Sequence, residues 1–338
     1  MKRQIVIYIL VSMLFVTCND KPTNSSLKIA IGSCYNTSLN DNSMWKEVVN
    51  TNPDLWIWLG DIIYADTYDM AFMKQKYDVL KQDIEYQKLL NSTNIIGIWD
   101  DHDYGINDGG KSYSKKKESK ELLLDFLDVD KSDEVNQHDG IYNSYVIGKG
   151  EKTVKIILLD TRYFRDDLEV DTISDERYKV NQNGDILGEE QWKWLEDELN
   201  KNEASVHIIA SGYQVIPWEA KYEKWSVFPT ARKRLFDMLQ KTKPNKAFLL
   251  SGDRHISEVS KLDLKNLDYP LYEFTSSGIT HTWSKKWPEQ NSHRVTELVI
   301  EKSFGIINIE WVNQEPNVTF EMRGQNDSIF AIYKPKFQ

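Results

Sequence analysis

Residues 55–61 read LWIWLGD, an unbroken apolar run that stops at a glycine and an aspartate. Five apolar residues without polar alternation are typical of a strand buried on both faces. Similar runs recur along the chain, at 27–32, 95–99, 154–159, 206–210 and 247–250. Helical patterns lie among them, at 70–90, 115–127 and 189–199. This alternation of strands and helices predicts an α/β fold.

The last part of the chain has more closely spaced apolar runs, at 271–275, 305–311, 318–322 and 329–333. This spacing predicts a more antiparallel arrangement there, because antiparallel strands need only short connections. The sequence contains no internal repeat and no low-complexity or Gly/Pro-rich linker after residue 26. We therefore predict one folded domain over residues 27–338.

Composition limits the function classes. The 338 residues include 42 basic and 52 acidic side chains, a formal net charge of −10 and only two Cys. An acidic chain is a poor candidate for non-specific nucleic-acid binding, which depends on neutralising phosphates with Lys and Arg. Two Cys cannot form a disulfide scaffold. An anionic substrate would also be disfavoured unless bound cations reversed the local charge.

The N-terminus has the pattern of an export signal. Lys2 and Arg3 precede an apolar run over residues 5–16. Twelve helical residues span roughly 18 Å, too short for the ~30 Å hydrocarbon core of a membrane. This segment is therefore predicted to be a secretory signal, and its removal takes the formal charge from −10 to −12 through the loss of Lys2 and Arg3.

The end of that segment, Phe15-Val16-Thr17-Cys18, resembles a bacterial lipoprotein signal, although Thr17 departs from the usual small residue. We expect a signal peptide over residues 1–17, a lipid anchor at Cys18 and a polar tether over residues 18–26. The protein would then be exported and anchored to a bacterial membrane, facing the periplasm or the cell exterior. The alternative is an ordinary secretory signal with an incidental Cys18.

Polar residues follow the predicted strands where each strand ends. They are Cys34, Asp61, Tyr64, Asp100, Asp101, His102, Asp160, Arg162, Gln214, Asp253 and His255. In α/β sheets, ligands bind beyond the carboxyl ends of the strands, where side chains converge on a shared crevice. The pattern predicts a metal site combined with a cationic clamp for an anion.

Each member of this set also has a structural explanation. Asp61 after a glycine is common turn chemistry, and a Cys such as Cys34 is often a small core residue. His102 or His255 could be a satisfied core or surface histidine. Arg162 could form a structural ion pair.

The adjacent residues Asp100 and Asp101 would face opposite ways in an extended segment. Only one of the two is then expected at a metal. The other would cap a helix or hold a histidine.

The same motifs, in order, resemble the alkaline phosphatase D (PhoD-like) family of metallophosphoesterases, over about residues 28–283, and more distantly the purple acid phosphatases. The matching elements are Cys34, Gly60-Asp61-x-x-Tyr64, Trp99-Asp100-Asp101-His102, Leu159-Asp160-Thr161-Arg162, Gly188-x-x-Gln191-Trp192 and Gly252-Asp253-x-His255. The resemblance implies a four-layer α/β/β/α sandwich with mixed sheets, an active site at the carboxyl ends of the strands, and phosphoester hydrolysis.

The resemblance also implies the ligands of two metal ions. Asp61 would bridge them, with Cys34, Tyr64 and His255 completing a ferric iron (Fe³⁺) site. Asp101 and Asp253 would hold the second ion, and two carboxylates there favour calcium. Other divalent metals would also fit such ligands.

Two catalytic roles follow from the resemblance. His102 would be the general acid or stabilise the transition state, and Arg162 would grip phosphate oxygens bidentately. Four further residues have no settled role: Asp100, Asp160, Gln214 and His281. Of these, Asp160 would orient Arg162, and Gln214 falls where relatives often place a histidine ligand.

The implied mechanism is in-line attack on phosphorus by a metal-bound hydroxide. The predicted protein is an exported phosphomonoesterase, phosphodiesterase or both, with a phospholipase- or teichoic-acid-type phosphodiesterase as the alternative. A non-catalytic lipoprotein that binds phosphate or glycans is the remaining class. The expected partners are a phosphoester substrate and a membrane reached through the lipidated N-terminus. We expect a monomer and no nucleic-acid surface.

Overall fold

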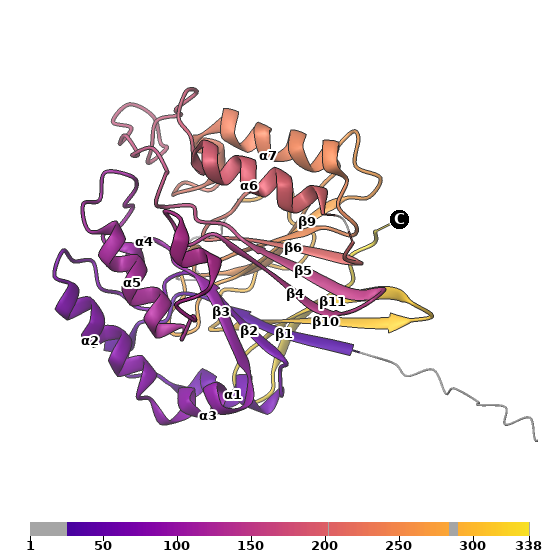
Figure 1. Ribbon diagram of the computed structural model, residues 1–338, viewed down its shortest axis with the longest axis horizontal. Coiled ribbons are helices and arrows are strands. Elements are labelled where there is room, and N and C mark those ends of the chain that lie inside the picture. Colours follow the sequence, from indigo (N-terminus) through magenta and orange to yellow (C-terminus); the bar gives the residue numbers. More distant parts are fainter. Residues whose placement is uncertain (1–25, 202, 284–289, 338) are drawn as a thin grey trace, which may run out of the picture.

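The structure, a computed structural model, describes residues 26–201, 203–283 and 290–337 (Figure 1). The predicted signal peptide, Cys18 and all of the predicted tether except Ser26 lie outside the described residues. Across the described ranges, no helix combines the length and the apolar character needed to cross a membrane.

Two six-stranded sheets form the centre of the molecule (Figure 1). The first contains, in spatial order, β12 (Ile329–Tyr333), β11 (Glu315–Arg323), β10 (Phe304–Val312), β1 (Ser26–Gly32), β2 (Leu55–Leu59) and β3 (Asn94–Ile98). The second contains β4 (Asn143–Lys149), β5 (Lys152–Leu158), β6 (Val206–Ser211), β7 (Phe248–Ser251), β9 (Leu271–Ser276) and β8 (Ser257–Leu262).

Both sheets are mixed. β1, β2 and β3 run parallel to one another, and so do β5, β6, β7 and β9. The remaining pairs are antiparallel, including β10 with β1 and the successive strands β10 to β12. The carboxyl ends of the parallel strands therefore lie together at one edge of each sheet, as expected from the sequence.

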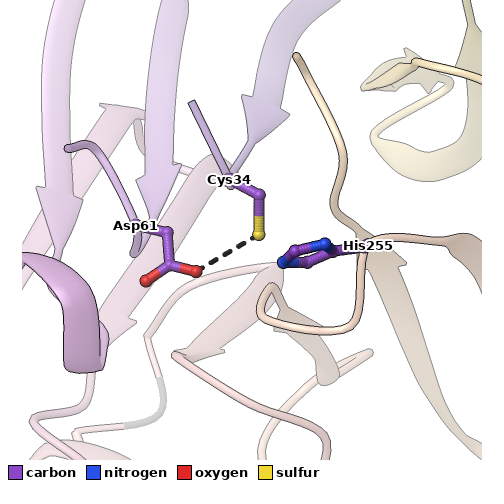
Figure 2. A group of neighbouring side chains, drawn as sticks. All are labelled: Cys34, Asp61 and His255. Carbon is purple, nitrogen blue, oxygen red and sulfur yellow. Dashed lines mark hydrogen bonds between the residues drawn. The ribbon is translucent and has the colours of Figure 1, made fainter. Parts of the chain in front are cut away.

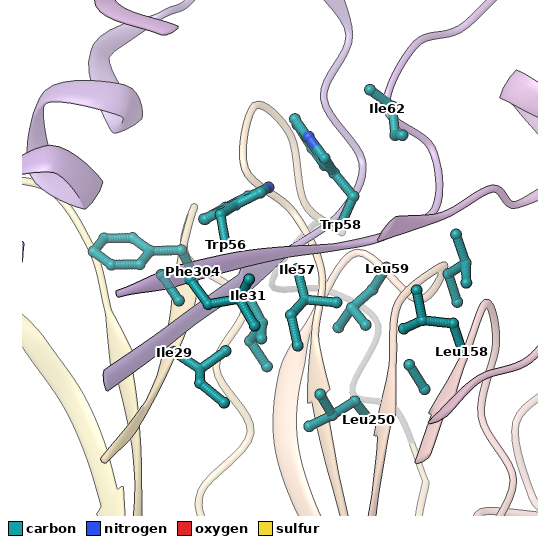
Figure 3. Packing of buried hydrophobic residues seen from close by; sticks show 14 of the residues in the cluster. Ile29, Ile31, Trp56, Ile57, Trp58, Leu59, Ile62, Leu158, Leu250 and Phe304 are labelled. Atoms are coloured by element: carbon teal, nitrogen blue, oxygen red, sulfur yellow. The ribbon is translucent and has the colours of Figure 1, made fainter. Parts of the chain in front are cut away.

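The two sheets pack face to face around the main hydrophobic core. Ile57 and Leu59 of β2 point toward Leu158 and Leu250 of the second sheet (Figure 3). On its other face, β2 presents Trp56 and Trp58, which Figure 3 shows pointing away from the second sheet. All five residues of β2 are buried, which confirms the interpretation of the continuous run.

Helices cover the outer faces of both sheets (Figure 1). On the side of the first sheet lie α1 (Ser43–Asn50), α2 (Met70–Lys81), α3 (Ile84–Ser92) and α5 (Lys116–Phe126). On the side of the second lie α6 (Gly188–Asn200) and α7 (Pro229–Thr242). The short elements are α4 (Asp101–Tyr104), η1 (Thr37–Leu39), η2 (Glu134–Gln137) and η3 (Trp225–Val227). The expected α/β/β/α sandwich is confirmed.

One predicted helix was wrong in its extent. The pattern over residues 70–90 forms two helices, α2 and α3, because Asp83 begins a new helix. Its Oδ1 accepts the backbone N–H groups of Glu85 at 2.8 Å and Tyr86 at 3.1 Å. An aspartate in this capping position stabilises a helix start strongly enough to interrupt a continuous apolar pattern.

Candidate metal centre

Three side chains from three different strand ends meet beyond the sheets (Figure 2). Cys34 follows β1, Asp61 follows β2, and His255 follows β7. Cys34 Sγ lies 3.3 Å from Asp61 Oδ2. Their ligand atoms and one from His255 all lie within 4.8 Å of one another, close enough to share one ion. The structure thus brings together residues that are up to 221 positions apart in the chain, Cys34 and His255.

Tyr64 completes this group. Its hydroxyl lies 3.2 Å from Asp61 Oδ2 and 3.2 Å from His255 Nε2. Sulfur, carboxylate, phenol and imidazole donors therefore converge on one point. A set of this kind suits a transition-metal ion such as iron better than a purely oxygen-preferring ion.

The backbone at these positions is unusual. Cys34, Asp61, Asp253 and His255 have φ angles of +60°, +49°, +63° and +54°. Side chains other than glycine rarely adopt this region, at a cost of about 1–3 kcal/mol each, and such strain clusters at functional sites. Aspartate and histidine adopt this region more readily than most residues, which softens the cost at Asp61, Asp253 and His255, whereas Cys34 has no such explanation. The turn after β1 therefore holds the Cys34 side chain in place against a local preference.

Burial disfavours charge throughout this group. Burial raises the pKa of the Cys34 thiol and, with the nearby Cys34, raises the pKa of Asp61 well above its usual range. Burial and the neighbouring Asp61 likewise raise the pKa of the Tyr64 phenol. Three acidic groups packed together can all ionise only if a strongly charged cation sits among them.

Asp61 is placed to bind one ion through each of its two carboxylate oxygens, as a bridging ligand does. Its Oδ2 faces Cys34 and Tyr64, while its Oδ1 is buried and has no hydrogen-bond partner. A buried carboxylate oxygen without a partner is costly unless something outside the protein binds it. The residues present therefore fit one metal ion on each side of Asp61.

A second, oxygen-rich group adjoins the first. Ligand atoms of Asp61, Asp101 and His102 lie within 4.8 Å of one another, as do those of Asp100, Asp101 and Asp253. Asp253 Oδ2 is buried and has no hydrogen-bond partner. Burial raises the pKa of Asp253. Burial also acts to raise the pKa of Asp101, but the charges of Arg162 and His102 and backbone hydrogen bonds together outweigh it and lower that pKa to about 2. Carboxylate oxygens in this arrangement suit a hard cation such as calcium.

The expected phosphate clamp at Arg162 is not supported by its surroundings. Arg162 is fully buried, its Nε donates to Asp100 Oδ1 at 2.6 Å, and one terminal nitrogen lies 2.7 Å from Glu223 Oε2. Its guanidinium also lies over the Tyr213 ring, 4.9 Å from the ring centre. Because carboxylates already engage this guanidinium, the structural ion-pair explanation is the one that the geometry favours.

Asp100 has the structural role left open by the sequence. It pairs with Arg162 and also precedes α4, where its backbone N–H donates to Asp103 Oδ1 at 2.6 Å. Asp101, the next residue, points into the oxygen-rich group and accepts the Asp108 N–H at 2.6 Å. Asp100 also belongs to a candidate group with Asp101 and Asp253, so the expected division of roles between the two adjacent aspartates stays a prediction.

His102 lies beside the first group and is held by a residue that the sequence did not single out. Its Nδ1 is 2.8 Å from both oxygens of Asp66, and its ring packs on Tyr64 with centroids 4.2 Å apart. Burial alone would lower the pKa of His102, but Asp101, Asp61 and Asp66 outweigh it and raise that pKa to about 11. The imidazole is therefore held in its protonated form, with Nδ1 fixed by a carboxylate.

Two of the residues with no settled role are structural. Asp160 Oδ1 accepts Trp99 Nε1 and the backbone N–H groups of Arg162 and Tyr163, each at 2.9 Å, so it shapes the turn after β5. Gln214 is buried and donates to Glu258 at 2.8 Å and Thr275 at 3.0 Å. Asp160 belongs to none of the groups of His, Cys, Asp and Glu side chains among the described residues that could hold a metal ion.

The fourth residue with no settled role, His281, adjoins the group of Cys34, Asp61, Tyr64 and His255 without joining it. Its ring packs edge-on against His255, with centroids 4.4 Å apart, and lies 5.1 Å from the Tyr64 ring. Burial lowers the pKa of His281 to about 4, so this imidazole is neutral. It forms part of the wall behind the two candidate ligands.

Three residues of this region were not found from the sequence: Asp66, Glu223 and Ser277. Asp66 and Glu223 lie in loops without a recognisable motif around them, whereas Ser277 follows the end of β9. Glu223 is buried between Arg162 and Arg165 and is reached only through the long connection after β6. No local pattern in one sequence marks such a contact.

Comparisons with known proteins identify the family to which the chain is similar. Residues 29–325 match the model of the PhoD-like phosphatase family. Alkaline phosphatase D of Bacillus subtilis (strain 168) is 23% identical over 300 residues, which cover 75% of this chain and 51% of that protein. The chain thus spans about half the length of this curated relative. A solved structure described as "Structure of PhoD" has a TM-score of 0.70 and 17% identity, and the match covers 91% of this chain and 68% of that one.

Proposed function

This chain belongs to the PhoD-like phosphatase family, and on that premise we propose that it hydrolyses phosphoesters at a centre of two metal ions. The ligands we propose are Cys34, Asp61, Tyr64 and His255 for an iron ion and Asp61, Asp101 and Asp253 for a calcium ion. The observation that carries this proposal is the position of Asp61. One of its oxygens faces Cys34 and Tyr64, and the other is buried without a hydrogen-bond partner.

When bound, the ions would act as Lewis acids that activate the attacking water and neutralise negative charge at phosphorus. The chain supplies the rest of the arrangement. The turns after β1 and β7 hold Cys34 and His255 at positive φ before any ligand arrives. The buried pair of Arg162 and Asp100 fixes the segment that carries Asp101, so the oxygen-rich group is preorganised.

His102 is the residue we propose to protonate the leaving oxygen. Asp66 holds Nδ1, which leaves Nε2 as the donor toward a substrate between the two groups. Part of the Asp61 and Asp101 charge would be neutralised by bound cations. The Asp66 contact would then be the main interaction that keeps the proton on His102.

The activity is tested with two substrates that share a chromophore, p-nitrophenyl phosphate and bis-p-nitrophenyl phosphate. Each is assayed with the full chain after chelation, and again after adding Fe³⁺, Ca²⁺ or both. We expect hydrolysis that is lost on chelation and restored by both ions together. The ratio of the two rates then assigns the enzyme as a monoesterase or a diesterase.

The alternatives give different results in the same assay. A phospholipase- or teichoic-acid-type enzyme would cleave the diester much faster and would also release headgroups from phospholipid vesicles or polyol phosphates from polyol-phosphate polymers. A non-catalytic binding protein would bind inorganic phosphate but hydrolyse neither chromogenic ester with any metal. That last outcome would refute the proposed function.

We also propose that the chain is exported and lipid-anchored through Cys18. The support is the sequence pattern of residues 1–18 alone. The test is labelling of the protein in a bacterial host with a fatty acid analogue. Cys18→Ser should abolish the label and release the protein from the membrane fraction. Unchanged labelling or unchanged membrane association in Cys18→Ser would contradict the anchor.

A further inference from the structure

Ser277 links two of the proposed metal ligands. It follows β9 directly and is fully buried. Its Oγ accepts the backbone N–H of His255 at 2.8 Å and lies 3.0 Å from Cys34 Sγ. Its own backbone N–H donates to Ile256 O at 3.0 Å, so the main chain that carries the hydroxyl is also held.

The direction of the contact with sulfur follows from the chemistry of the two groups. A serine hydroxyl has one proton to donate, whereas a thiolate has none. Once Cys34 is a metal-bound thiolate, its sulfur can only accept. The backbone N–H of His255 uses one of the acceptor positions of Ser277 Oγ, and the hydroxyl proton remains available for Cys34 Sγ.

We infer that Ser277 is a positioning residue of the metal centre: its hydroxyl donates to the Cys34 thiolate while holding the backbone of His255. This inference rests on the proposed function, because it requires a metal-bound Cys34. Hydrogen bonds to a ligating sulfur withdraw electron density from it, which raises the reduction potential of the metal and the energy of sulfur-to-metal charge transfer. Ser277 therefore controls how much electron density the Cys34 sulfur donates to the metal ion.

A second serine near the same sulfur provides a matched control. Ser33 is also fully buried, and its Oγ lies 3.6 Å from Cys34 Sγ. Its proton is directed elsewhere, since Ser33 Oγ donates to the carbonyl oxygen of Ser276 at 3.3 Å. Replacing either serine by alanine removes one buried hydroxyl beside Cys34, but only Ser277→Ala removes a donor to the sulfur.

The test uses the full chain loaded with Co²⁺ alone, because Co²⁺ bound to a thiolate shows a sulfur-to-metal absorption band. We expect the band of Ser277→Ala to move to longer wavelength than in the wild type, and the band of Ser33→Ala to stay in place. We also expect Ser277→Ala to bind Co²⁺ roughly 10–100-fold more weakly, the usual effect of losing a group that supports a ligand. With iron bound, Ser277→Ala should have the lower reduction potential.

The band position does not depend on how much protein folds, so a lower yield of Ser277→Ala would not obscure the result. Coincident bands in Ser277→Ala, Ser33→Ala and the wild type would overturn the inference, and so would equal shifts in both variants. Failure of the proposed function looks different. The wild type itself would then show no sulfur-to-cobalt band, or would bind metal without hydrolysing either p-nitrophenyl ester.

Discussion

Asp61 is the residue on which the proposed chemistry depends. It lies between a group with sulfur, phenol and imidazole donors and a group made mainly of carboxylates. Such a carboxylate can place unlike ions a few ångströms apart, and each ion then lowers the cost of ionising the buried groups around it. The acidic composition of the chain is consistent with an anionic substrate for the same reason.

The pairing of His102 with Asp66 leads to a prediction at the residue scale. Asp66→Asn removes the charge that fixes Nδ1 and favours the protonated ring. We expect turnover of phenyl phosphate, which has a poor leaving group, to fall about 10–100-fold. Turnover of p-nitrophenyl phosphate, whose leaving group needs little protonation, should fall only a few-fold. The measurement is kcat for both esters with wild type and variant.

An equal loss for both esters would show that Asp66 acts on the fold of the site and not on protonation of the leaving group. No loss for either would remove His102 from the mechanism. Asp69→Asn is a suitable control, because Asp69 is a nearby acid whose side chain caps α2.

Most of the candidate site residues that were identified from the sequence lie within a few positions of the end of a buried strand. Cys34, Asp61 and His255 were found because the strand ends define where they lie. The direction in which a long side chain extends could not be predicted from its position after a strand. Arg162 also follows a strand, but its guanidinium turns inward to Asp100 and Glu223. A partner such as Glu223, which comes from a distant loop, gives no local signal.

At the scale of elements, the turn after β2 depends on Gly60. Gly60 has a φ of +87°, and a Cβ there would lie 2.4 Å from Asp100 Cβ and 2.7 Å from Asp100 N. The ends of β2 and β3 approach this closely because Asp61 and Asp101 must face the same centre.

We expect Gly60→Ala to lower the free energy of unfolding by about 3 kcal/mol, through backbone strain and the clash with Asp100. Gly150→Ala is the matched control. Gly150 also has a positive φ, +58°, but a Cβ added there would meet no atom within 4 Å. Its cost should be only about 1 kcal/mol. Urea unfolding of both variants measures the difference, and equal costs would contradict the close approach.

Strands were more predictable than helices in this chain. The runs at 55–59 and 329–333 match β2 and β12 residue for residue. Burial on both faces explains the continuous apolar sequence of β2, whereas β12 lies at a sheet edge and is largely exposed. By contrast, α1, α7, β4 and β8 were not identified. β4 lies at a sheet edge, and most of its residues are only partly buried, so its sequence lacks the apolar run.

At the scale of the whole molecule, the family and the sandwich fold predicted from the motifs are confirmed. The pairing of β10 with β1, which adds the C-terminal strands β10–β12 to the first sheet, could not be predicted from the sequence. Pairing between segments so far apart in the chain depends on tertiary packing. This topology holds the strands that carry Cys34 and Asp61 in the middle of the first sheet.

The burial of a histidine in the second sheet leads to a prediction about how the free energy of unfolding depends on pH. His207 in β6 is buried, its Nδ1 lies 3.1 Å from Asn245 O, and its Nε2 has no hydrogen-bond partner. Burial lowers the pKa of His207 to about 4, below the ordinary value of 6.5. The unfolded chain therefore binds this proton more readily, and the free energy of unfolding falls as the pH drops from 6.5 toward 4.

Between pH 7 and pH 5, the wild type should lose about 2 kcal/mol more stability than His207→Gln, which cannot take up the proton. Urea unfolding of both proteins at the two pH values gives this difference directly. Identical pH dependence in the two proteins would mean that His207 has the same pKa in the folded and the unfolded chain, which would contradict the effect of burial.

The central claim, that Asp61 joins two ions in a centre that hydrolyses phosphoesters, is tested most directly with Asp61→Asn. The measurement is metal content and turnover of bis-p-nitrophenyl phosphate on the same samples of wild type and variant. We predict that the wild type carries both metals and is active, and that the variant loses one metal or both together with at least 100-fold in turnover. A variant that keeps its metals and its activity would contradict the account.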